Sequence, residues 1–320
     1  MTTYSLDNIT PLSSLQLFGF DLHFKNFVSL FDNNTFPKVN MFTGAKGQGK
    51  FTLSLHIVNY ILSKKLNQNS DYDLTNHTIN PNSPIYKSIL NNINQNFIYL
   101  GKNYKKKISV DDIRELKKKI NISSLNNLPR FIILDDVETF NINSANALLK
   151  IIEEPSDTNF FILINNKSQN IIETLKSRSI ETKIFLSVNE KKEIVKKLMN
   201  NFNISDCDYN QYLRYTTPGL FIKFCYLIPS LKISIDDSFF NIGKILLHDY
   251  KKNKNEVSLD LLNFLFDVKF FNNIKNNKKS IITASKTRSD IIKLLNNYRF
   301  SNLSNESVLY FLKENFNYVK

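Results

Sequence analysis

The residues of this sequence with the clearest chemical potential form a short glycine-rich loop. Three of the seven glycines lie within six residues, in the segment Gly44-Ala45-Lys46-Gly47-Gln48-Gly49-Lys50. Glycines allow successive backbone N–H groups to face one anion, and a lysine at the start of the following helix adds positive charge. The pattern is typical of a loop that binds nucleotide phosphates. The alternative is a strand-to-helix turn whose glycines serve packing alone.

The position after Lys50 departs from this pattern. A loop that handles a Mg²⁺-nucleotide carries Ser or Thr there, because a hydroxyl binds the metal ion, and this chain has Phe51. Thr52 follows one residue later, about 100° further around a helix. We therefore expect ATP as a possible ligand that is bound without efficient hydrolysis, Mg²⁺ only together with nucleotide, and no metal site of the protein's own.

A second group of candidates follows an apolar run. Phe131–Leu134 predicts a buried strand, and Asp135 and Asp136 come directly after it. Parallel α/β sheets bind ligands at the carboxyl ends of their strands, so Asp135 is placed to hold Mg²⁺ through water and Asp136 to orient an attacking water. The alternative is that both carboxylates cap the N-terminus of a helix.

The elements that must position these residues alternate along the chain. Strands are predicted in the short apolar run that begins at Val39 and leads into the glycine loop, and at Phe97–Leu100, Phe131–Leu134, Phe160–Ile164 and Lys183–Leu186. Helical periodicity follows the glycine loop, runs from a capping box at Ser109 through Ile120, and covers Ala145–Ile152 before Pro155. This order predicts a mostly parallel sheet covered on both faces. The polar segment 63–96, with two prolines, predicts a surface excursion.

Helical patterns dominate from Ser187, where a second capping box begins. The break at Thr217-Pro218-Gly219 falls within this part. We therefore predict an α/β domain over residues 1–186, a small helical domain over 187–232 and a helical domain over 233–320.

Composition excludes several classes of protein. The 42 Lys and Arg exceed the 29 Asp and Glu, which gives a net charge of +13 and favours either phosphate-bearing partners or solvated helix faces. No apolar run approaches the ~20 residues of a membrane span, and no signal peptide pattern begins the chain, so we expect a cytoplasmic protein with no membrane partner. Cys207 and Cys225 are the only cysteines, so we expect two buried thiols and no zinc.

Three longer motifs resemble the clamp-loader branch of the AAA+ ATPases. They are Asp135-Asp136-Val137-Glu138, the stretch from Asn143 through Leu148-Leu149-Lys150 to Glu153-Glu154-Pro155, and Ser177-Arg178-Ser179, which stands at that family's Ser-Arg-Cys motif. The resemblance extends over residues 15–186. It implies a Rossmann-like AAA+ P-loop NTPase domain, followed by a small helical lid and an all-α collar domain that joins subunits into a ring.

The resemblance also implies roles for single residues. Arg178 matches the arginine finger, which acts in trans on the transferring phosphoryl group in a neighbouring subunit. Asn165 and Asn166 occupy the region of the polar sensor, and Leu220 stands where the second sensor places an arginine. Phe51, Asp136 in place of Glu, and Leu220 each remove something that hydrolysis needs, so weak or no ATPase activity is expected of the chain alone.

The expected function is that of a clamp-loader subunit in a replicative DNA polymerase holoenzyme, a nucleotidyltransferase assembly. The implied partners are an ATPase subunit, a clamp-opening subunit, the sliding clamp and primed DNA, with Lys105–Lys107 and Lys117–Lys119 as candidate DNA contacts or as solvated faces. The alternative is a self-sufficient AAA+ motor on DNA-associated substrates that uses Lys50, Asp135 and Asp136. A small-molecule kinase is disfavoured, because no acceptor site or lid arginines follow residue 187.

Overall fold

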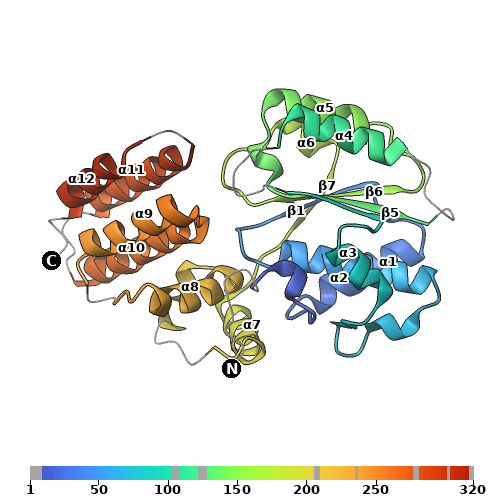
Figure 1. The fold of residues 1–320 in the computed structure, drawn as a ribbon, viewed down its shortest axis with the longest axis horizontal. Coiled ribbons are helices and arrows are strands. Elements are labelled where there is room, and N and C mark those ends of the chain that lie inside the picture. The colour runs from blue at the N-terminus through green and yellow to red at the C-terminus, as the bar shows by residue number, and fades with distance from the viewer. Residues whose placement is uncertain are drawn as a thin grey trace. The chain divides into compact units, whose positions relative to one another are not determined.

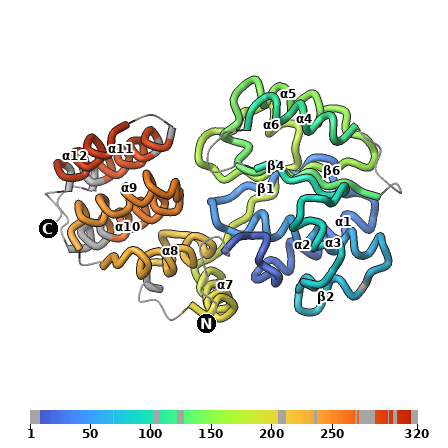
Figure 2. Tube along the Cα trace, in the orientation of Figure 1, coloured from blue at the N-terminus to red at the C-terminus, as the bar shows by residue number. Residues whose placement is uncertain are grey.

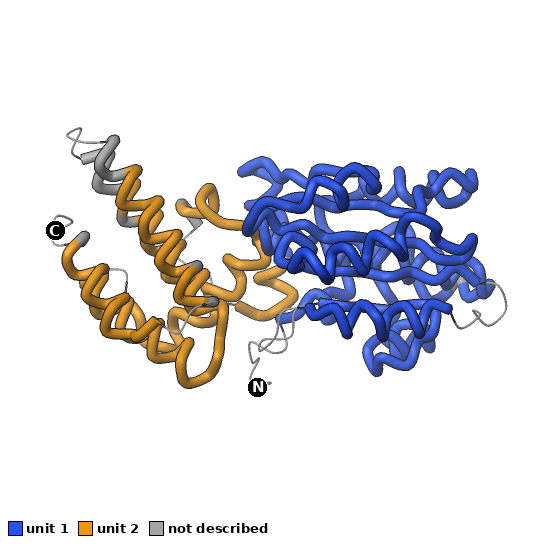
Figure 3. Tube along the Cα trace, turned by 90° about the horizontal axis from the view of Figure 1, so that it is seen from above, with its two compact units in different colours: residues 1–197 blue, residues 198–320 orange. Residues whose placement is uncertain are grey.

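The computed structural model describes residues 9–101, 108–121, 128–204, 210–234, 237–276, 281–300 and 303–316. The predictions for Lys105–Lys107 and Cys207 lie outside these residues. The chain divides into two compact units, residues 1–197 and 198–320 (Figure 3). The sequence-based boundaries at 186 and 232 remain predictions.

Unit 1 is built on a five-stranded parallel sheet. In spatial order its strands are β4 (Phe97–Leu100), β5 (Arg130–Leu134), β6 (Asn159–Asn165), β1 (Val39–Thr43) and β7 (Ile180–Lys183). Every neighbouring pair runs parallel, which confirms the predicted sheet. The strands that precede the glycine loop and the aspartates, β1 and β5, are therefore separated by β6.

Helices cover both faces of the sheet (Figures 1 and 2). One face carries α1 (Asp21–Asp32), α2 (Lys50–Lys65) and α3 (Pro84–Leu90), and the other carries α4 (Val110–Asn121), α5 (Ile142–Ile152) and α6 (Glu173–Ser177). Single-turn helices lie at η2 (Pro11–Ser13), η3 (Asn69–Asp71) and η5 (Val137–Thr139).

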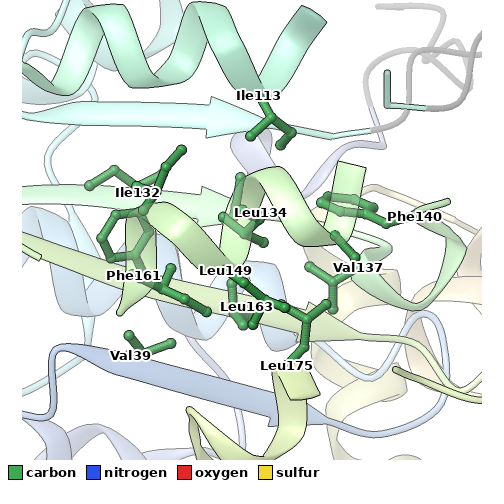
Figure 4. Close-up of a cluster of buried hydrophobic side chains, with 14 of the residues drawn as sticks. Val39, Ile113, Ile132, Leu134, Val137, Phe140, Leu149, Phe161, Leu163 and Leu175 are labelled. Atoms are coloured by element: carbon green, nitrogen blue, oxygen red, sulfur yellow. The ribbon is translucent and has the colours of Figure 1, made fainter. Parts of the chain in front are cut away.

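The alternation of side chains along the strands explains how both helix layers pack on the sheet. On the α4–α6 face, Ile132, Leu134, Phe161 and Leu163 are fully buried in one apolar cluster with Leu149 (Figure 4). The next residues along each strand serve the opposite face, because successive side chains of a strand alternate. The sheet is thus apolar on both sides, as expected for a parallel sheet between helices.

Two local predictions differ from the structure. The last strand, β7, begins three residues earlier than predicted, because it is an edge strand whose residues are largely accessible and carry no apolar run. The segment 63–96 is more than a surface excursion. It contains the short antiparallel pair β2 (Tyr72–Asp73) and β3 (Thr78–Ile79) and the helix α3. Ile79, Ile85 and Ile89 are buried, although the many asparagines of the segment leave no continuous apolar run in the sequence.

The predicted capping box of α4 is confirmed. Asp112 N–H donates to Ser109 Oγ over 3.3 Å, and the Asp112 carboxylate accepts from Ser109 N–H over 2.6 Å. We expect Ser109→Ala to lower the free energy of unfolding by about 1 kcal/mol, since the first turn loses its side-chain acceptor. Urea denaturation would measure this, with Ser70→Ala at an exposed, non-capping serine as the control. Equal stability of both variants would contradict the prediction.

Unit 2 contains helices and no strand among its described residues, as predicted. Helix α7 (Val188–Asn201) crosses from the first unit into the second. It is followed by η6 (Asn210–Tyr215), α8 (Pro218–Ser230), α9 (Phe239–Asn253), α10 (Glu256–Asn276), α11 (Ile281–Phe300) and α12 (Asn305–Phe316). Arg288 pairs with Asp267 over 2.7 Å and so links α11 to α10. Cys225 is buried in α8. No described helix has the length and apolar character that crossing a membrane requires.

Candidate nucleotide-binding site

The glycine loop joins β1 to α2 and depends on its glycines. Gly47 and Gly49 have positive φ angles of 80° and 91°, a conformation that other residues adopt only with strain. A Cβ on Gly44 would lie 2.4 Å from the side-chain oxygen of Gln48 and 2.5 Å from the carbonyl oxygen of Ile184. The loop is therefore closely packed against its surroundings as well as bent.

Lys50 is the first residue of α2, and its side chain turns back across the loop. Its Nζ donates to the carbonyl oxygens of Gly44 and Ala45 over 2.7 and 2.8 Å. Burial lowers the pKa of Lys50 to about 8, while the carboxylates of Asp135, Glu138 and Asp136 act in the opposite direction. Lys50 thus bonds to its own loop and acts as counter-ion to a buried acidic group.

Phe51 occupies the position after Lys50, where a phosphate-binding loop usually carries the Ser or Thr that binds the metal ion. Its ring is buried and meets Tyr99 of β4 edge to face, with 4.9 Å between ring centroids. Thr52 lies next along α2 and is partly buried. Residue 51 therefore offers an aromatic contact and no oxygen, and the loop does not fit the usual coordination of a Mg²⁺-nucleotide. Within the described residues no group of three or more His, Cys, Asp or Glu is suited to a metal ion.

Asp135 and Asp136 lie at the carboxyl end of β5, as predicted. Asp136 has a left-handed backbone with φ 54°, and its N–H donates to Asp135 Oδ1 over 2.8 Å. Burial and then the charge of Asp136 raise the pKa of Asp135 to about 6. The backbone and side-chain bonds hold the pair in a fixed geometry, and Asp135 titrates closer to neutral pH than an ordinary aspartate.

The residue that joins the two aspartates is Asn166, just beyond β6. Its Nδ2 donates to Asp135 Oδ1 over 3.0 Å and to Asp136 Oδ1 over 2.7 Å. Asn165, the other residue of the predicted sensor region, accepts from Lys167 N–H through its side-chain oxygen and from Gly44 N–H through its backbone carbonyl oxygen. Strand β6 therefore bonds to the glycine loop through Asn165 and to the aspartates through Asn166.

Glu138 is a further member of this group that the sequence reading gave no role. It is buried, and its carboxylate accepts from Asn166 N–H, Ser168 N–H and the Ser168 hydroxyl over 3.1, 3.2 and 2.7 Å. Glu138 ends the motif Asp135-Asp136-Val137-Glu138, but its partners lie about thirty residues away in the sequence, so the motif does not indicate these contacts.

Arg178 lies apart from these contacts, at the C-terminal end of α6. Its guanidinium Nη2 is 2.9 Å from Glu153 Oε1, and its side chain is 40% exposed. The hydroxyl of Ser179 donates to the carbonyl oxygens of Leu175 and Lys176 over 3.0 and 3.1 Å, and so caps the helix end. Leu220 lies in α8 of the second unit and brings no charge. The structure thus gathers the loop, the aspartates and the asparagines into one site, and leaves Arg178 on the surface.

A three-layer fold around a parallel sheet, with a glycine loop after β1 and an aspartate pair after β5, defines a P-loop domain of the AAA+ type. A helical part follows it in the chain, as expected. The family model for DNA polymerase III, delta subunit, matches residues 21–185, just over half of the chain. The chain belongs to this family.

Two relatives found by sequence similarity agree with this assignment. The DNA polymerase III subunit delta' of Pseudomonas aeruginosa is 32% identical over 85 residues, which are 27% of this chain and 26% of that protein. The protein of the same name from Buchnera aphidicola subsp. Baizongia pistaciae is 30% identical over 139 residues, 42% of this chain and 40% of the relative. The chain therefore matches well under half the length of these relatives. A solved gamma subunit-related protein of DNA polymerase III from Thermotoga maritima is 16% identical, with a TM-score of 0.46 over 93% of this chain and 99% of that one.

Proposed function

We propose that this chain is a delta'-type clamp-loader subunit of a DNA polymerase III holoenzyme. In an ATP-driven ring it would help to load the sliding clamp onto primed DNA in the cytoplasm, beside an ATPase subunit and a clamp-opening subunit. Its part is to complete the ring and to donate Arg178 to a neighbouring ATPase subunit, with little or no ATP hydrolysis of its own. Its membership of the delta subunit family and the names of its relatives support this proposal.

One contrast within unit 1 carries the proposal. Phe51 gives the glycine loop an aromatic contact in place of a metal ligand, and the Lys50 ammonium is bonded to the loop's own carbonyl oxygens. Arg178, the residue that would serve a neighbour, is accessible at the end of a capped helix. A chain of this kind can bind nucleotide at most without efficient turnover and can still complete another subunit's site.

Contact with DNA would come from charge rather than from base recognition. The groove between α4 and α5 is lined by Arg114, Lys117 and Lys150 and by Asp111, which pairs with Arg114. The phosphate backbone attracts cationic side chains without regard to sequence. The exposed run Lys117–Lys119 adds positive charge to α4 on more than one side, because consecutive helix residues lie about 100° apart, and its alternative role is solvation of α4. These contacts would be made within the assembled ring.

The test begins with the purified chain. We expect no ATP turnover above background, with or without primed DNA, and we expect Lys50→Ala to behave like the natural chain in this assay. The same chain should form a stable complex with its ATPase and clamp-opening subunits in gel filtration. Robust turnover that Lys50→Ala abolishes would contradict the proposal and favour the self-sufficient motor.

A further inference from the structure

The Arg178 guanidinium is held by a carboxylate of its own chain. Nη2 lies 2.9 Å from Glu153 Oε1, and Nη1 donates to the carbonyl oxygen of Thr174 over 3.4 Å. Both side chains of the ion pair are about half exposed, 40% for Arg178 and 47% for Glu153. An ion pair this exposed contributes little to stability, because water competes for both charges. Stability therefore does not explain why Arg178 and Glu153 are paired.

The backbone fixes the two partners independently. Glu153 is the C-cap of α5, its N–H donates to the Leu149 carbonyl oxygen over 3.0 Å, and Pro155 prevents the helix from continuing. Arg178 is the C-cap of α6, a helix whose Leu175 is fully buried in the same apolar cluster as Leu149 (Figure 4). The ends of both helices are thus anchored to one rigid core, and the ion pair connects them at the surface.

We propose that Glu153 is a positioning residue, which orients the Arg178 guanidinium for the neighbouring ATP site. This inference rests on the proposed role of Arg178 as an arginine finger. An arginine side chain has many rotamers, and one that is already restrained loses less freedom when it meets a phosphate. The carboxylate occupies one edge of the guanidinium, and the terminal phosphate of ATP, with its greater negative charge, can engage the other N–H groups.

Steady-state kinetics on the reconstituted complex with its own partner subunits would test this role. We expect Glu153→Ala to lower kcat about tenfold with KM unchanged, because the transition state loses an oriented charge while ATP binding does not involve Glu153. Glu153→Gln keeps the shape without the charge and should lie between Ala and the natural residue. Glu153→Asp should restore part of kcat. Glu154→Gln, at the adjacent exposed carboxylate, is the matched control and should leave kcat unchanged.

The outcomes separate this inference from the function on which it rests. Arg178→Ala serves as the reference, and loss of turnover in it with full turnover in Glu153→Ala would overturn the role of Glu153 alone. Full turnover in Arg178→Ala would instead remove the finger and the inference together. A raised KM at constant kcat would place Glu153 in ATP binding and would also overturn the inference. Thermal melting of each variant shows whether any fall in kcat reflects misfolding.

Discussion

Under the proposed function, replacing Arg178 by alanine is expected to lower ATP turnover about 1000-fold at the active site of a neighbouring subunit. An arginine that reaches into another subunit's site stabilises negative charge on the phosphoryl group only in the transition state, so its loss lowers kcat rather than ATP affinity. Turnover by the reconstituted complex, with clamp and primed DNA present, measures the effect. The purified chain should fold and melt like the natural protein, since the side chain is exposed and its ion pair is weak.

Two further variants test whether the effect requires a guanidinium group and whether it is specific to Arg178. Arg178→Lys keeps the charge and loses the planar fork of donors, so it should restore little of the lost turnover. Arg214→Ala removes another accessible arginine, in η6 of unit 2, and should leave turnover unchanged. If Arg178→Ala retained full turnover in a complex that had assembled, the arginine finger would have to be sought elsewhere.

The second large effect concerns stability against pH and begins with His56. The ring lies fully buried in α2, with Nε2 3.0 Å from the Ser14 carbonyl oxygen and Nδ1 3.0 Å from the Tyr72 hydroxyl. A carbonyl can only accept, so Nε2 carries the hydrogen, and Nδ1 of the neutral ring accepts from Tyr72. Burial lowers the pKa of His56 from 6.5 to about 4. Its contribution to stability is therefore present above pH 6.5 and is lost as the pH falls through 4, by about 3 kcal/mol.

Asp135 acts in the opposite direction over nearly the same range. Its pKa is raised from 3.8 to about 6, first by burial and then by the charge of Asp136. A carboxyl group of this kind stabilises the fold below pH 3.8 and loses that contribution as the pH rises through 6, again by about 3 kcal/mol. Between pH 4 and 6.5 the two groups therefore offset each other.

Removing either titrating group should reveal the pH dependence of stability that the other contributes. Relative to the natural protein, Asp135→Asn is expected to lose about 3 kcal/mol more stability when the pH is lowered from 6.5 to 4. His56→Gln should show the reverse slope, whatever its stability at neutral pH. Urea denaturation at half-unit pH steps gives both slopes as differences from the natural chain, so the other titrating groups cancel. A slope for Asp135→Asn parallel to that of the natural chain would show that Asp135 does not titrate in this range.

Much of the α/β unit could be predicted from the sequence, because its signals are local. Each of these signals is contained in a few consecutive residues. Examples are the capping boxes that begin at Ser109 and Ser187 and the apolar runs of β4 and β5. β7 was displaced in the prediction, because an exposed edge strand lacks the apolar run that marks a buried one.

The candidate site was predictable only in part. The loop and the aspartates follow recognisable patterns, whereas the contacts of Asn166 and Glu138 depend on the pairing of β5 with β6. No spacing in the sequence distinguishes Asn165 from Asn166. In the structure Asn165 ends β6, and the side chain of Asn166, the next residue, reaches the carboxylates. The ion pair of Arg178 with Glu153 depends in the same way on how two helix ends pack on the core.

The contact between Phe51 and Tyr99 bears on how this chain can evolve. A Thr at position 51 would introduce a hydroxyl and would also remove a buried ring from its contact with Tyr99, which costs about 3 kcal/mol or more in a packed interior. Under the proposed function, hydrolysis also lacks the groups that Asp136 and Leu220 replace, so a hydroxyl at position 51 is expected to lower stability without a gain in activity. Because replacing Phe51 costs stability, descendants of this protein are expected to keep an aromatic residue at position 51.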